Sequence, residues 1–168
     1  MGRITTPHLV AAINKVARMN LAEQEQLTDT IHRHQPNLLY SVLSLKSTQA
    51  TMDDIGVVLK LLLVCYQAMQ ESDSTWPLIS EATQEHNLTG LSARLRQSER
   101  LPASKQNAFI DKTISAHIEK ELLAYVMNEI NNATLPDDDE TAKRMMLVAF
   151  NLVECIAQPT KPKAKRKR

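Results

Sequence analysis

Residues 52–71, MDDIGVVLKLLLVCYQAMQE, form the predicted helix around which we expect the rest of the chain to fold. Thr51 precedes it and Asp54 follows three positions later, a spacing typical of a capping box at a helix start. Apolar residues at helical spacing form one face and also cover much of the other: Ile55, Val57, Val58, Leu59, Leu61, Leu62, Val64, Cys65, Tyr66 and Met69. A helix that is apolar nearly all round is buried among neighbours on several sides. We therefore expect this helix at the centre of a helical bundle.

The sequence on the N-terminal side predicts three amphipathic helices. Thr6, which is followed directly by a proline, is the expected N-cap residue of the first helix. Asn20 is the expected cap of the second, which should end before Pro36 because proline disfavours helical backbone in the residue before it. The third is expected over residues 37–46. All three carry apolar residues on one face, so each can pack on the central helix.

The C-terminal side predicts a weaker helix, then two long ones. The weak helix is expected from Trp76 toward His86, with Gly90 marking a helix end or a tight link. An apolar stripe in steps of four predicts one continuous helix over residues 102–131. The last helix is expected to begin with an acidic first turn at 137–140, where carboxylates complement the helix dipole. It is expected to end before Pro159.

These segments predict an all-α fold, a compact irregular bundle of six or seven helices. The chain has 168 residues and only three glycines, which makes a glycine-rich phosphate loop, a dinucleotide-binding fingerprint and a hairpin-rich β fold improbable. We expect residues 1–159 to form a single helical domain, with 72–76 as the one place where two subdomains could separate. Residues 160–168 are expected to form a flexible basic tail.

The two cysteines and the hydropathy pattern indicate a protein of a reducing compartment. Cys65 and Cys155 lie 90 positions apart in apolar helical runs, and no Cys/His cluster offers a zinc ligand set. We expect both to be buried free thiols. The most apolar run, Val57–Tyr66, is too short to cross a bilayer. The expected location is the cytoplasm, or the nucleus if the basic tail is a eukaryotic localisation signal, and no membrane partner is expected.

Catalytic chemistry finds little support in the sequence. On a continuous helix His117, Glu121 and Tyr125 would form one row beside the apolar stripe, which could line a polar pocket or bind a proton. The same row could be a flank that meets solvent. That alternative is favoured, because one helical row supplies no nucleophile and no orienting group from elsewhere. No metal or cofactor motif is present, so we expect neither.

Charge is distributed unevenly along the chain. The formal net charge is +1, from 20 basic and 19 acidic residues, but six of the last eight residues are basic. The remaining 160 residues carry 14 basic against 19 acidic side chains, a net charge of −5. The candidate binding residues of the tail, for nucleic acid or an acidic partner, are Lys161, Lys163, Lys165, Arg166, Lys167 and Arg168. No aromatic residue lies among them, so any contact with nucleic acid would be independent of base sequence.

Three hypotheses for function follow from these observations. The first is a non-enzymatic helical interaction or adaptor protein, which binds another protein or a second copy of itself and uses the tail as an electrostatic tether. The second is a sequence-independent nucleic-acid accessory protein that binds through the tail. The third, a ligand-binding or enzymatic bundle with a pocket near His117, has the least support.

Overall fold

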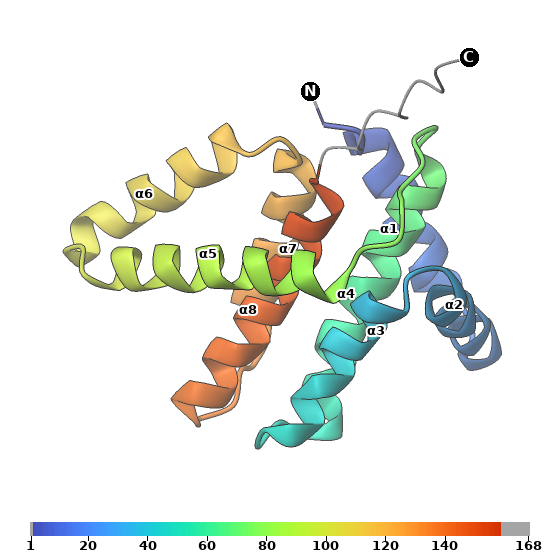
Figure 1. Cartoon of the computed structure of the whole chain (residues 1–168), viewed down its shortest axis with the longest axis horizontal. Coiled ribbons are helices and arrows are strands. Elements are labelled where there is room, and N and C mark those ends of the chain that lie inside the picture. Colours follow the sequence, from blue (N-terminus) through green and yellow to red (C-terminus); the bar gives the residue numbers. More distant parts are fainter. Residues whose placement is uncertain (1, 159–168) are drawn as a thin grey trace, which may run out of the picture.

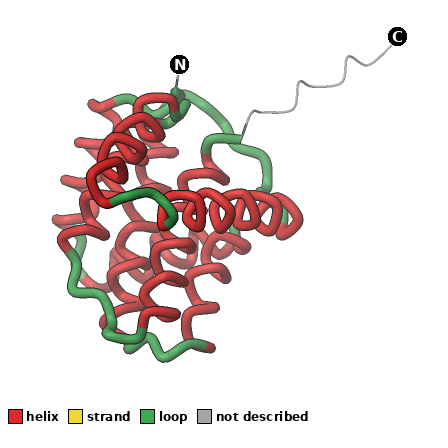
Figure 2. Tube along the Cα trace, turned by 90° about the vertical axis from the view of Figure 1, so that its left-hand side faces the viewer, coloured by secondary structure: helices red, strands yellow, loops and turns green. Residues whose placement is uncertain are grey.

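The computed structural model describes residues 2–158 and confirms the all-α class (Figure 1). The described part of the chain contains eight α-helices and one short 3₁₀ helix, and Figure 2 shows them joined by short loops. The helices are α1 (Thr6–Arg18), α2 (Leu21–His34), α3 (Pro36–Leu43), η1 (Ser44–Ser47), α4 (Met52–Glu71), α5 (Glu81–Glu99), α6 (Ala103–Ala116), α7 (Lys120–Asn132) and α8 (Asp139–Ile156).

Helix α4 forms the centre of the bundle, as its sequence predicts. Ten of its twenty residues are buried, and it packs chiefly on α1, with α3 and α8 on other sides. Its start is the predicted capping box: Asp54 N–H donates to Thr51 Oγ1 over 3.2 Å, and Thr51 N–H donates to Asp54 Oδ2 over 2.7 Å. The prediction for the second helix is also confirmed, because the Asn20 side chain accepts from Glu23 N–H. Local capping chemistry therefore places the central helices correctly.

The first helix begins one residue away from its predicted cap. Thr5, with extended backbone, is the N-cap residue, and Thr6 is already helical. Pro7 consequently lies in the first turn, where its missing N–H leaves no intrahelical hydrogen bond unmade.

The expected continuous helix over 102–131 is wrong: the chain breaks between Ala116 and Lys120, which separates α6 from α7. His117 has extended backbone, with φ −76° and ψ 139°. The apolar stripe runs through this break in the sequence, but Ile118, one of its members, is 53% exposed, whereas Glu119 is only 1% exposed. Burial of the Glu119 carboxylate against a distant segment prevails over the local helical pattern. Because the break divides one expected helix into two, the described chain has more α-helices than the six or seven expected.

The segment 76–101 also differs from its prediction. Residues from Trp76 to the N-cap Ser80 are not helical, and α5 continues through Gly90, where a helix end or link was expected. Gly90 does not adopt a positive φ, so it behaves as an ordinary helical residue. Helix α5 crosses α8 and then extends beyond it, and α6 returns above α5 at the edge of the molecule (Figure 1).

Candidate functional site

The second half of α5 and the whole of α6, residues 91–116, form a projecting pair of helices that we call the arm (Figure 1). None of the fourteen residues of α6 is buried, whereas half of α4 is. The helix packs on α7 and more sparsely on α5. The arm is therefore a surface feature attached at its base.

Apolar side chains of the arm are only partly covered. Five of them are half-buried and lie outside the cluster that forms the hydrophobic core, namely Leu91, Leu95, Leu101, Phe109 and Ile110. Ile114, near the base of α6, is the arm residue that packs against the core. The arm thus presents an apolar surface that the rest of the described chain does not fully cover.

The arm is basic on an otherwise acidic body. Residues 91–116 contain five basic and two acidic side chains, a net charge of +3. Arg94 Nη2 lies 3.4 Å from Glu154 Oε1 of α8, so this arginine is paired at the base of the arm. Arg96, Arg100, Lys105 and Lys112 are exposed. The apolar side chains are therefore accompanied by positive charge.

A buried carboxylate fixes the base of the arm to the N-terminal segment. Glu119 accepts hydrogen bonds from the main-chain N–H groups of Arg3 (2.8 Å) and Ile4 (3.2 Å). Its Oε1 also lies 3.9 Å from Arg3 Nε. The approach is so close that a Cβ on Gly2 would lie 2.5 Å from the Ile118 carbonyl oxygen and 2.8 Å from Glu119 Oε2. Residues 2–4 therefore hold the link between α6 and α7 in place.

The guanidinium of Arg3 extends this anchor to the end of α8. It donates to the main-chain oxygens of Ile156 and, over 2.8 Å, of Gln158. It also lies 4.4 Å from the ring centroid of Trp76, whose indole N–H donates to the Ile156 oxygen over 2.8 Å. Burial lowers the pKa of Arg3, and the charge of Glu119 partly offsets this effect. We call Arg3, Glu119 and Trp76 the terminal clamp.

His117 has a different environment from the one that the sequence predicts. Its Nδ1 accepts from Glu119 N–H over 3.0 Å, so the ring proton is assigned to Nε2, which lies 3.2 Å from Glu154 Oε1. Burial alone would raise the pKa of Glu154, but the hydrogen bond from His117, together with the charge of Arg94, outweighs burial and leaves that pKa below its ordinary value. His117 thus ties the α6–α7 link to α8.

The predicted row of His117, Glu121 and Tyr125 does not form, because His117 lies outside the helix that carries the other two residues. Glu121 is half-buried in the first turn of α7. Tyr125 is half-buried against the core, and burial raises its phenol pKa. Sequence reasoning missed Glu119 and Glu154 as the partners of His117. The one local signal was Glu154, which lies inside the apolar stretch LVECI, residues 152–156.

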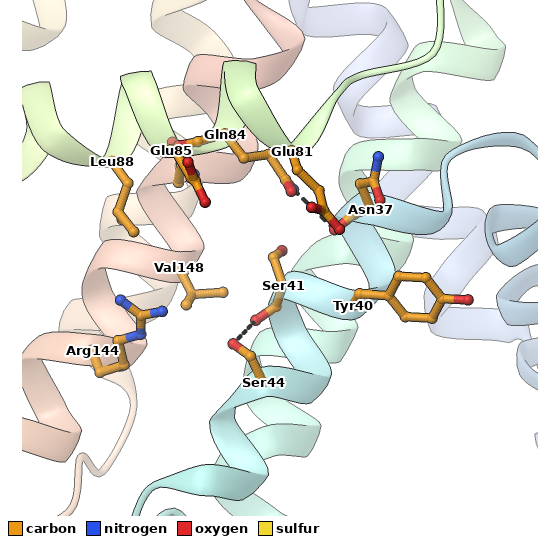
Figure 3. Close-up of a pocket in the computed structure, with 11 residues that line it drawn as sticks. Asn37, Tyr40, Ser41, Ser44, Glu81, Gln84, Glu85, Leu88, Arg144 and Val148 are labelled. Carbon is orange, nitrogen blue, oxygen red and sulfur yellow. Dashed lines mark hydrogen bonds between the residues drawn. The ribbon is translucent and has the colours of Figure 1, made fainter.

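A cavity of about 230 Å³ lies between α3, α5 and α8 (Figure 3). In Figure 3 the α5 side chains lie above it, those of α3 on one side and those of α8 on the other. The lining residues include Asn37, Ser41, Glu81, Gln84, Glu85, Leu88, Arg144, Val148 and Asn151. Sequence analysis did not single out any of them, because they come from three helices more than 35 positions apart along the chain.

Cys65 and Cys155 are free and buried, as predicted, and burial raises their thiol pKa values to about 12 and about 11. Such thiols are not nucleophiles at neutral pH. Within residues 2–158 no group of three His, Cys, Asp or Glu side chains could hold a metal ion. The basic tail lies outside the described residues.

None of the helices described here is long and apolar enough to cross a membrane. Comparison with protein families, curated proteins and solved structures gives no match for this chain.

Proposed function

We propose that this protein is a non-enzymatic helical interaction protein and that the arm is its docking surface. The observation that carries the proposal is α6, which buries none of its residues although it carries Phe109 and Ile110. Ordinary surface helices bury an apolar stripe against their own core. A helix that leaves such a stripe half-covered has apolar area to bury against a partner.

The charge of the arm indicates the kind of partner. Its exposed basic residues flank half-buried leucine, isoleucine and phenylalanine side chains. An amphipathic helix of another protein, with an apolar face and acidic flanks, matches both properties. Lys161 and its basic neighbours in the tail would attract the same acidic partner over a longer distance. In this way the tail would act as an electrostatic tether.

Two designed peptides test this proposal. Both have leucines at helical spacing on one face; one has glutamates on its flanks and the other has lysines at the same positions. Fluorescence anisotropy with labelled peptide should show saturable binding of the acidic peptide and much weaker binding of the basic one. Affinity should fall as salt rises, because exposed charges are screened.

Matched variants of the protein locate the surface. Leu95→Ser and Phe109→Ser should each weaken binding of the acidic peptide, whereas Leu21→Ser, which removes an exposed leucine of α2, should not. Deletion of 160–168 should lower affinity mainly at low salt. Circular dichroism checks that each variant is folded. Equal binding of the two peptides, or binding unaffected by both arm substitutions, would overturn the proposal.

The nucleic-acid hypothesis is an outcome of the same assay. A labelled oligonucleotide of arbitrary sequence replaces the peptide. Retention that requires residues 160–168 but not Leu95 or Phe109 would support sequence-independent nucleic-acid binding through the tail instead.

A further inference from the structure

The cavity between α3, α5 and α8 has a lining that is rich in hydrogen-bond acceptors. Three amide side chains tie the helices together there through their nitrogen donors. Asn37 Nδ2 donates to the Ile79 oxygen (2.9 Å), Gln84 Nε2 to the Asn37 main-chain oxygen (2.9 Å) and Asn151 Nδ2 to the Gln84 main-chain oxygen (3.1 Å). One N–H of each amide is used in this way, and the side-chain oxygens of these amides remain as acceptors.

One of these acceptors is buried without a partner. Asn151 is 6% exposed, and its Oδ1 makes no hydrogen bond within the described chain. A buried acceptor that lacks a donor has lost its hydration without compensation. The Ser41 hydroxyl also donates, to the Leu38 oxygen, which leaves its own oxygen as a further acceptor. The acceptors of Asn37, Gln84 and Ser41 that line the cavity therefore complement an occupant that supplies N–H donors.

Opposite charges lie on separate walls of the same cavity. Glu81 and Glu85 come from the first turns of α5, whereas Arg144 comes from α8 on another side (Figure 3). Within residues 2–158 no ion pair includes any of these three side chains. Leu88 and the buried Val148 supply apolar surface between them. A guanidinium favours a carboxylate, and paired carboxylates favour an ammonium group.

We propose that this cavity binds a small zwitterion of the amino-acid class. The ammonium group lies against Glu81, Glu85 and the amide oxygens, the carboxylate against Arg144, and an aliphatic side chain against Leu88 and Val148. The volume, about 230 Å³, is below the roughly 300–1,000 Å³ typical of drug-sized ligands and suits a small metabolite. This site does not depend on the arm or on its proposed partner.

Three compounds of closely similar shape test the proposal. L-Leucine carries both charges, isopentylamine lacks the carboxylate and isocaproate lacks the amine. Titration of ¹⁵N-labelled full-length protein, followed by amide chemical shifts, should show saturable binding of L-leucine with changes around the cavity. Each truncated compound should bind about tenfold more weakly, because it loses a charge-assisted interaction.

Charge-removing variants assign each end of the ligand. Arg144→Gln should remove the preference for L-leucine over isopentylamine, and Glu81→Gln combined with Glu85→Gln should remove the preference over isocaproate. Arg33→Gln and Glu25→Gln, exposed positions on α2, are the matched controls and should change neither preference. Chemical-shift spectra without ligand verify that the variants are folded.

Several results would overturn the zwitterion site. A panel of the standard amino acids that gives no saturable shift at the cavity excludes it. Equal affinities for the three compounds, or preferences that persist in the Arg144 and Glu81/Glu85 variants, do the same. None of these results bears on peptide binding by the arm, so the two proposals fail separately.

Discussion

Helices α4 and α6 both carry large apolar side chains but have opposite roles in the molecule. Ten residues of α4 are buried and none of α6 is. Helix α4 has a capping box at its N-terminus and neighbours on several sides, whereas the start of α6 has no side-chain cap and α6 is held mainly through its link to α7. Stability therefore resides in α4 and the helices packed on it, whereas the arm supplies surface that is available to a partner.

The comparison is tested most strongly by truncating one side chain in each helix. Leu62→Ala removes a side chain of α4 that is fully buried, so it should lower the free energy of unfolding by about 2–5 kcal/mol. Phe109→Ala in α6 removes a larger but half-exposed side chain and should cost about 1 kcal/mol or less. Urea denaturation measures both. Equal losses would mean that α6 belongs to the core.

A second test removes the anchor of the arm. Glu119→Ala leaves the part-buried N–H of Arg3 and the buried N–H of Ile4 without an acceptor, so it should cost about 2–4 kcal/mol. Hydrogen exchange should show increased opening of α6 and of residues 3–5, while α4 keeps its protection relative to global unfolding. Lys120→Ala, an exposed neighbour, is the control and should change little. A uniform loss of protection in all helices would contradict a local anchor.

A third, smaller effect concerns pH. The pKa of Glu154 is lowered in the folded protein, so this group stabilises the fold above its unfolded pKa, near 4.5, and the contribution is lost as pH falls through the folded pKa. Glu154→Gln should therefore reduce stability at neutral pH and make the loss of stability below about pH 5 less steep, as proton linkage requires when one carboxyl is removed. Chemical denaturation at several pH values measures this slope. An unchanged slope would show that Glu154 does not contribute to the acid sensitivity.

The smallest effect is expected from two helical glycines. A Cβ at Gly56 of α4 or at Gly90 of α5 would meet no atom within 4 Å. Each glycine-to-alanine substitution should stabilise the protein by about 0.5–1 kcal/mol, because alanine loses less backbone entropy on folding. If the arm opens independently of the rest of the protein, Gly90→Ala should raise the free energy of opening of the arm more than it raises the free energy of global unfolding. Hydrogen exchange combined with urea denaturation separates the two effects.

Sequence reasoning succeeded where the determining interactions are local. The boxes at Thr51 and Asn20 join residues three positions apart, and both helix starts were predicted from them. The break between α6 and α7 was not predictable in this way, since Glu119 is held by residues 115 and 116 positions earlier. The local pattern of apolar residues continued through the break and gave the wrong answer.

The candidate sites show the same contrast between local and long-range interactions. The cavity combines Asn37, Glu81 and Arg144, residues whose proximity depends on how three helices pack. No periodicity in the sequence contains that information. His117 was recognised as unusual, but its partner Glu154 lies 37 positions away and its actual position outside a helix depends on Glu119. The tail residues, recognised from composition alone, stay a prediction.

The terminal clamp has a consequence for the order in which the chain folds. Arg3 contacts Ile156 across 153 positions and Glu119 across 116. During synthesis from the ribosome, α1 can pack on α4 long before the residues that hold the N-terminal segment exist. Contacts of such high sequence separation close last, because the loop-closure entropy must be overcome first. The clamp therefore cannot form until α8 has been synthesised, whereas the packing of α1 on α4 does not require α8.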